Sequence, residues 1–174
     1  MRLRTALFSS MVGVGILTAA ALPAGASALD LPEDGAVYTI RAQHSGKCLD
    51  VQADGLGDSV PVIEWTCHGG SNQQWRVQED ADKFMIQEVH SGRCLDVEGA
   101  SLDDGAPLIQ WSCHTSGGNE VWYLVYAGAG SFELQAAHSG KCADVQGGSS
   151  ADGSRVIQYT CAGTDNQRWK FVRA

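Results

Sequence analysis

One chemical pattern occurs three times along the chain, and each copy combines a carboxylate with an aromatic ring. The copies span residues 44–75, 90–122 and 138–169. In each, a cysteine is followed two residues later by an aspartate, and an aromatic residue precedes a second cysteine. A carboxylate accepts hydrogen bonds from hydroxyl groups, and an aromatic ring covers an apolar face. Such a set could bind a neutral sugar, which has hydroxyl edges and C–H faces.

The same residues provide little for catalysis. The sequence contains no Gly-x-Ser-x-Gly elbow and no His-Glu-x-x-His pair. A glycosidase needs two carboxylates about 5–10 Å apart in different environments, whereas the repeated acids occur once per copy. We therefore expect no enzyme activity, no catalytic residues and no cofactor.

Three histidines also repeat, and they could in principle meet at a metal ion. His44, His90 and His138 each stand beside Ser-Gly, and no carboxylate repeats next to them. Ser-Gly at this place is a turn signal. We therefore expect these histidines to lie at hairpin turns and predict no metal site.

The first residues have the pattern of a cleaved signal peptide. Arg2 and Arg4 precede a largely apolar run over residues 11–22, which is short for a membrane span. Residues 26–28 read Ala-Ser-Ala, a small-x-small cleavage signal. We predict that residues 1–28 are removed and that the mature domain, residues 29–174, is secreted, soluble and extracellular. The alternative is a membrane anchor, which the short apolar run disfavours.

Charge and composition narrow the possible partners. The chain has a formal net charge of −8, and removal of Arg2 and Arg4 makes the mature domain −10 (10 basic and 20 acidic residues). An acidic protein without a basic stripe is unsuited to nucleic acid or anionic membrane surfaces. The 21 glycines and 18% charged residues suit a loop-rich all-β protein.

Six cysteines fall inside the copies, and each pair is 19 residues apart. Fifteen pairings are possible in principle. Threefold repetition in an oxidising compartment favours one disulfide inside each copy, and a zinc site is disfavoured because no pair has Cys-x-x-Cys spacing. The predicted pairs are Cys48 with Cys67, Cys94 with Cys113, and Cys142 with Cys161.

Strand and turn signals account for the rest of each copy. Residues 37–42, 84–89 and 132–137 alternate apolar and polar side chains and run into His-Ser-Gly. Two short strands around an Asp-Gly loop follow, and then a fourth strand around a tryptophan. We assign these tryptophans to the core; they are Trp75, Trp122 and Trp169. The count is about twelve strands in three copies, too few copies for a propeller, so we expect the copies to close on themselves.

The repeated Cys-Leu-Asp-Val, aromatic-x-Cys and Asn-Gln-x-Trp segments resemble the ricin-B-type lectins, also known as family 13 carbohydrate-binding modules. The resemblance covers residues 37–172. It implies a β-trefoil of three repeats, about residues 37–80, 81–127 and 128–174. It also implies a monomeric, non-catalytic lectin that binds galactosides, xylan or similar carbohydrates at up to three shallow sites.

The resemblance further implies which residues form the sites: the aspartate, the aromatic residue and the Asn-Gln pair of each repeat. Glu120 departs from this pattern, because a carboxylate cannot donate as an amide can. Many relatives carry a glutamine two residues before the aromatic residue, where this chain has isoleucine. Because of this difference, the resemblance does not indicate which sugar is preferred. His68 and His114 stand where some relatives contact sugar. The implied site residues are Asp50, Trp65, Asn72 and Gln73 in the first repeat, Asp96, Trp111, Asn119 and Glu120 in the second, and Asp144, Tyr159, Asn166 and Gln167 in the third.

Structural interpretations of the same residues stay open at this point. The aspartates could anchor turns and the asparagines could hold loops through local bonds. The aromatic residues could be core residues, since each follows a buried-looking isoleucine by two. An alternative function is a secreted protein-binding trefoil, such as a hydrolase inhibitor, acting through one asymmetric loop over residues 99–107 or 114–119.

Overall fold

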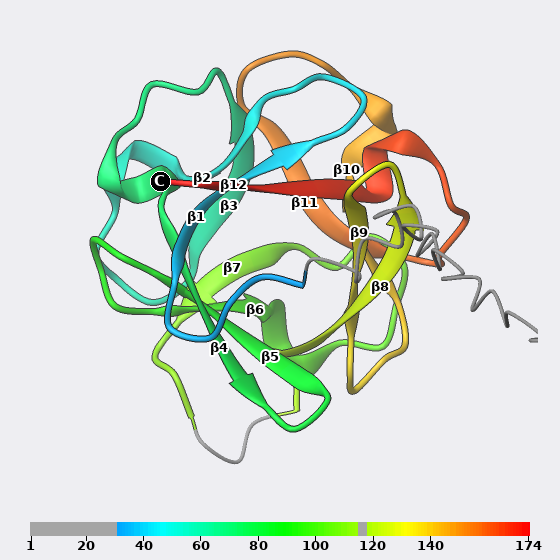
Figure 1. Cartoon of the computed structure of the whole chain (residues 1–174), viewed down its shortest axis with the longest axis horizontal. Coiled ribbons are helices and arrows are strands. Elements are labelled where there is room, and N and C mark those ends of the chain that lie inside the picture. The colour runs from blue at the N-terminus through cyan, green and yellow to red at the C-terminus, as the bar shows by residue number, and fades with distance from the viewer. Residues whose placement is uncertain (1–30, 115–117) are drawn as a thin grey trace, which may run out of the picture.

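The computed structural model describes residues 31–114 and 118–174. The predicted signal peptide, residues 1–28, and part of the 114–119 loop lie outside the described residues. Figure 1 shows the strands of the three repeats arranged around a common centre. Within the described residues the strands belong to one 12-stranded sheet. Their bounds are β1 Val37–Ala42, β2 Cys48–Val51, β3 Val60–Trp65, β4 Trp75–Asp80, β5 Lys83–Glu88, β6 Cys94–Val97, β7 Leu108–Trp111, β8 Val121–Gly128, β9 Ser131–Ala136, β10 Cys142–Val145, β11 Ser154–Tyr159 and β12 Arg168–Arg173.

A closed antiparallel barrel forms from the first and last strand of each repeat. β1 pairs with β4 and β12, β5 pairs with β4 and β8, and β9 pairs with β8 and β12. The middle strands form the hairpins β2–β3, β6–β7 and β10–β11. These hairpins pair with one another through β3–β7, β3–β11 and a bridge between Pro107 and Ile157. A barrel with three mutually paired hairpins is the predicted β-trefoil.

The predicted core tryptophans are fully buried in the barrel. Each comes from the last strand of its repeat and fixes that strand to the second strand of the same repeat. The bonds are Trp75 Nε1 to the Leu49 carbonyl, Trp122 Nε1 to the Leu95 carbonyl and Trp169 Nε1 to the Ala143 carbonyl, each at 3.0 Å. Because a buried indole N–H needs an acceptor, this repeated bond lets a large apolar ring fill the core without an unpaired donor.

The three disulfides confirm the predicted pairing within each copy. Each joins the start of one hairpin strand to the segment just beyond its partner strand. Each closes a loop of about 20 residues, which contributes on the order of 3 kcal/mol in the chain-entropy model. The disulfides therefore hold the mouth of each hairpin closed.

Details of the strands and loops differ from the sequence-based expectation. The strands predicted over 84–89 and 132–137 each lie one residue earlier, at β5 and β9. The loops after the second strands contain short 3₁₀ turns, Gln52–Asp54, Glu98–Ala100 and Gln146–Gly148. Two more such turns precede tryptophan strands, at Ser71–Gln73 and Asp165–Gln167. Ala53 adopts a left-handed φ of 55°, where the other two repeats have glycine, so periodicity alone did not reveal these turns.

A second set of three aspartates, which we call the junction aspartates, connects neighbouring repeats. Asp58 of repeat 1 accepts bonds from Arg93 Nε at 2.6 Å and from the Ser112 backbone N–H at 2.8 Å, both in repeat 2. The third junction returns from repeat 3 to repeat 1, so the set closes a ring. The equivalent contacts are Asp104 with Lys141 and Thr160, and Asp152 with Lys47 and Thr66. The sequence-based predictions did not include these contacts, although an aspartate and a basic residue recur in register in all three repeats.

Each junction also contains a buried side chain from the third strand of a repeat. The Gln110 amide donates to the carbonyls of Gly55 and Gly57, at 2.8 and 2.7 Å. Gln158 donates in the same way to the carbonyls of Ser101 and Asp103, at 2.8 and 2.9 Å. The glutamines therefore face the neighbouring repeat.

Repeat 1 has Glu64 at the corresponding position. Glu64 accepts a bond from Ser45 Oγ on Oε2, whereas its buried Oε1 has no hydrogen-bond partner. A carboxylate oxygen cannot supply the donors that an amide gives to the two loop carbonyls. Among the three junctions, only the one between repeats 3 and 1 therefore has a buried side-chain oxygen without a partner at this described position, Glu64 Oε1.

The described residues contain no helix long and apolar enough to cross a membrane.

Candidate functional site

The first hairpin and the turn after it bring the predicted residues of repeat 1 together. Asp50 lies on β2, Trp65 ends β3, and Asn72 lies in the 3₁₀ turn before β4. They border a hollow of about 310 Å³, lined by Asp50, Gln52, Ala53, Asp54, Ile63, Trp65, His68 and Asn72. Because its wall is an aromatic side chain and its rim is polar, the hollow suits a small hydroxyl-rich ligand.

The positions of Ile63 and Trp65 show whether the aromatic residue, which follows a buried isoleucine by two, is itself a core residue. Both residues border the hollow, as alternation predicts. Ile63 is 3% exposed and lies at its floor, whereas Trp65 is 41% exposed and forms its wall. The aromatic residue extends past the packed part of the barrel and is not a core residue.

Two amide groups fix the Asp50 carboxylate. Asn72 Nδ2 and Gln73 Nε2 donate to the same oxygen, Oδ2, at 3.1 and 2.8 Å. Asn72 also donates to the Val51 carbonyl at 3.2 Å, so it holds the loop and the aspartate together. The pKa of Asp50 is raised by burial, which the Gln73 bond and nearby His68 partly oppose. The second oxygen, Oδ1, accepts neither amide bond.

Gln73 differs from its expected role as a sugar contact. It is fully buried, and its Oε1 accepts from the His68 backbone N–H at 2.9 Å while its Nε2 also donates to the Thr66 carbonyl at 3.1 Å. Gln167 is buried in the same way in repeat 3. The side chain that follows the asparagine of each turn points inward, so these glutamines support the aspartate from behind.

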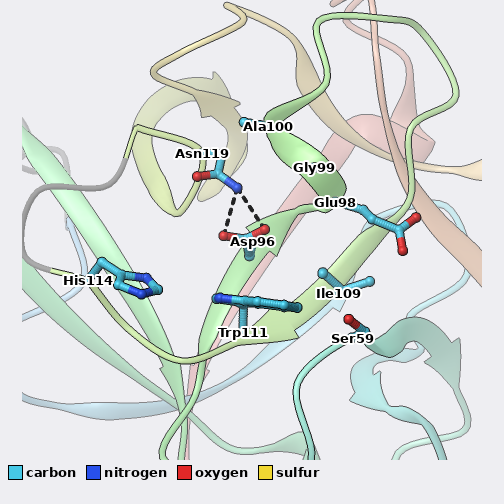
Figure 2. A pocket seen from close by; sticks show the side chains of 9 residues that line it. All are labelled: Ser59, Asp96, Glu98, Gly99, Ala100, Ile109, Trp111, His114 and Asn119. Carbon is cyan, nitrogen blue, oxygen red and sulfur yellow. Dashed lines mark hydrogen bonds between the residues drawn. The ribbon is translucent and has the colours of Figure 1, made fainter.

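The second repeat builds a similar hollow of about 270 Å³. Figure 2 shows Asp96 above the Trp111 ring, with His114 to one side. Trp111 is 37% exposed, and Asn119 Nδ2 donates to both Asp96 oxygens, at 2.8 and 2.9 Å. The hollow is lined by Ser59, Asp96, Glu98, Gly99, Ala100, Ile109, Trp111, His114 and Asn119.

Glu120 changes the electrostatics behind this hollow. Its Oε1 accepts from the His114 backbone N–H at 2.6 Å, and its buried Oε2 has no hydrogen-bond partner. The pKa of Asp96 is raised to about 7, first by burial and then by the charge of Glu120. Burial also raises the pKa of Glu120. Two carboxylates therefore share a place where repeats 1 and 3 have one carboxylate and one amide.

The third repeat returns to the arrangement of the first. Asn166 Nδ2 and Gln167 Nε2 donate to Asp144 Oδ2 at 3.0 and 2.9 Å. Tyr159 is 47% exposed at the position of the two tryptophans, and burial raises the pKa of Asp144. Ala162 occupies the position of His68, so the third repeat has no imidazole after its second cysteine, and the histidine that influences Asp144 is His44.

Two of the three turn histidines contact loops of another repeat. His44 Nε2 lies 3.0 Å from the Ser149 carbonyl, and His138 Nε2 lies 3.0 Å from the Ser101 carbonyl. These contacts connect repeats at the turns where the sequence places the histidines.

Two family models match this chain. A ricin-type beta-trefoil lectin domain-like model covers residues 28–111, and a ricin-type beta-trefoil lectin domain model covers residues 82–174. The second model alone covers more than half of the chain. Together they extend across all three repeats.

Solved structures agree with this assignment. The designed threefold-symmetric protein ThreeFoil is 45% identical, with a TM-score of 0.77 over 79% of this chain and 99% of its own. An exo-β-1,3-galactanase from Clostridium thermocellum is 34% identical, with a TM-score of 0.77; the match covers 81% of this chain and 31% of the galactanase chain. The Macrolepiota procera ricin B-like lectin, in complex with lactose, shares the fold at 22% identity, with a TM-score of 0.72 over 83% of this chain and 99% of its own.

The threefold repeated fold and both family matches indicate the same family of carbohydrate-binding proteins. The chain belongs to the ricin-type β-trefoil lectin family.

Proposed function

We propose that this protein is a secreted, monomeric lectin without catalytic activity, which binds neutral sugar units of extracellular carbohydrates at up to three sites. One observation carries the proposal. In every repeat a nearly buried aspartate is fixed by an asparagine beside an exposed aromatic ring. We call Asp50, Asp96 and Asp144 the pocket aspartates.

The arrangement suits a sugar for a physical reason. A hydrogen bond to a charged acceptor contributes about 1.5–3 kcal/mol, and the ring packs against the C–H face of the sugar. The amides hold the carboxylate before the ligand arrives, so little ordering entropy is lost on binding. One shallow site of this kind is weak, and three sites on one rigid domain increase the binding to a polymer through effective concentration.

Galactosides and xylan are the ligands we propose to test first. The similarity to the galactanase supports galactosides as ligands. The match covers most of this lectin domain but only a part of the galactanase. Because this part is 31% of the galactanase chain, the similarity does not carry the enzyme's activity to this protein. Release of reducing sugar by the pure protein would contradict the non-catalytic part of the proposal.

A glycan array and polysaccharide pull-downs test the binding directly. The protein is compared with a triple variant, Asp50→Asn/Asp96→Asn/Asp144→Asn, in which each amide can still offer an oxygen to the supporting asparagine. We expect binding by the wild-type protein and loss of binding by the triple variant, with an unchanged circular dichroism spectrum. Undiminished binding by a folded triple variant would overturn the site assignment.

The alternative of a protein-binding trefoil depended on an asymmetric loop. The described loop over residues 99–107 has counterparts in the other repeats: the Gly105 N–H donates to the Gln158 carbonyl, and the Gly153 N–H donates to the Glu64 carbonyl, each at 2.9 Å. Its residues thus join repeats, which disfavours a separate partner site there. The loop over 114–119 lies partly outside the described residues.

A further inference from the structure

The pocket aspartate of repeat 2 differs from those of repeats 1 and 3 in the side chain that lies behind it. Gln73 and Gln167 each donate an amide N–H to the pocket aspartate of their repeat, at 2.8 and 2.9 Å. Glu120 occupies the same position and cannot do so when ionised. Its Oε2 is buried without a hydrogen-bond partner, and the nearest recorded basic side chain is His114, whose Nδ1 lies at 3.9 Å.

Two neighbouring carboxylates repel each other when both are ionised, and a positive charge between or beside them relieves this repulsion. A shared proton can provide that charge, and so can a cation that approaches from the open side. The pKa of Asp96 is raised to about 7 by burial and by Glu120, so at neutral pH this proton leaves at little cost. A cationic group in the hollow can therefore take its place.

We infer that the hollow of repeat 2 selects a sugar that carries a protonated amino group, whereas the proposed sites of repeats 1 and 3 take neutral sugars. This inference rests on the proposed function, since it names the ligand class of one proposed site. The ammonium group would lie beside Asp96, close to the charge of Glu120 and to the face of Trp111. An aromatic face attracts a cation through its quadrupole.

The charged groups around the hollow favour a cation. Glu98 lines the hollow together with Asp96, and Glu120 lies behind. Among the described residues that line it, neither lysine nor arginine occurs. His114 is the one basic side chain among these lining residues, and it is largely exposed to solvent. Asp54 borders the hollow of repeat 1, but there the group behind the aspartate is the neutral Gln73.

The test isolates the second site in the full protein by Asp50→Asn/Asp144→Asn. Calorimetric titrations at pH 7 compare galactosamine and glucosamine with galactose, glucose and the N-acetylated forms. We expect the free amino sugar to bind about two- to fivefold more tightly than its parent and its N-acetylated form. Added Glu120→Gln, which copies repeats 1 and 3, should remove this preference and retain the neutral sugar. Equal affinity for the three forms, or a preference that survives Glu120→Gln, would overturn the inference.

A matched protein separates this inference from the proposed function. Asp96→Asn alone leaves sites 1 and 3, which should bind the neutral sugar without preference for the amine. If this protein binds neutral sugar but the isolated second site binds neither form, the inference fails and the proposed function stands. If neither protein binds any sugar on the array, both fail.

Discussion

The pocket aspartates and the junction aspartates are the same residue type, repeated three times each, in contrasting surroundings. The pocket set is nearly buried and bonded by neutral amides, and the pKa of each of its members is raised, first by burial. The junction set lies near the surface and is bonded by lysine or arginine. These bonds lower the pKa of Asp58, Asp104 and Asp152.

The difference indicates how the carboxylates that we propose to bind sugar differ from the structural ones. A junction aspartate already has a cationic partner and a backbone N–H, so its acceptor capacity is used within the protein. A pocket aspartate is oriented by amides and retains capacity for a ligand. Recurrence along the chain is the same for both sets, so recurrence alone does not indicate binding.

The largest expected change in sugar affinity comes from replacing one aspartate of each set in a protein that retains a single sugar-binding site. Trp111→Ala and Tyr159→Ala silence repeats 2 and 3. In that background Asp50→Asn should weaken sugar binding about 30-fold, because a charged acceptor bond of roughly 2 kcal/mol is lost. Asp152→Asn, whose contacts are Thr66 and Lys47, should change the affinity less than about twofold. Equal losses in a calorimetric titration would remove the distinction between the two sets.

Glu64 permits a comparison among the junctions themselves. Glu64→Gln should increase the free energy of unfolding by about 1–2 kcal/mol, because the amide can donate to loop carbonyls and no unpaired carboxylate oxygen stays buried. The converse change, Gln110→Glu, should be destabilising. Chemical denaturation measures both. A destabilising Glu64→Gln would show that the carboxylate has a partner which the junctions of Gln110 and Gln158 lack.

Glu120 provides a pH-dependent comparison among the pockets. The folded-state pKa of Asp96 lies above its ordinary value of 3.8, so its contribution to stability is complete below that value and is lost as the pH rises through about 7. Glu120→Gln removes the facing charge. It should stabilise the protein by about 1 kcal/mol at pH 8 and by much less at pH 5, as measured by urea denaturation. A gain independent of pH would show that charge is not the cause.

The smallest effect is expected for one junction aspartate. Asp104→Asn should lower the melting temperature by about 2 °C at pH 7, because the bond from Lys141 is weakened. The lowered pKa of Asp104 means that its contribution is present above the ordinary value of 3.8 and is lost as the pH falls through the lowered value. The melting-temperature difference should therefore disappear in strong acid, as scanning calorimetry can verify. A difference that grows in acid would contradict the assignment of Asp104 to a charged junction.

Much of the fold could be predicted because many of the contacts that define a repeat are made within that repeat. The disulfide pairs and the buried tryptophans lie within single repeats, so spacing and periodicity were enough to assign them. The exposed aromatic wall needed family resemblance, since alternation along β3 places Ile63 and Trp65 on one face and does not say where the packed core ends.

The contacts between repeats could not be predicted in the same way. Gln110 and Gln158 donate to loops of other repeats, and Gln73 turns inward behind Asp50. Their partners are distant in sequence, and a local pattern does not record them. The left-handed conformation of Ala53 was not predicted either, because alanine, unlike glycine, does not indicate that conformation.

The amino-acid sequence by itself determined three copies, their internal disulfides, the four strands of each and the residues that could bind a sugar. Only the tertiary structure decided which aspartates border a hollow, which join repeats, and that the charge of Glu120 raises the pKa of Asp96. The physical reason is that solvation, hydrogen bonding and pKa depend on neighbours in space, and in a closed barrel many of those neighbours come from another repeat.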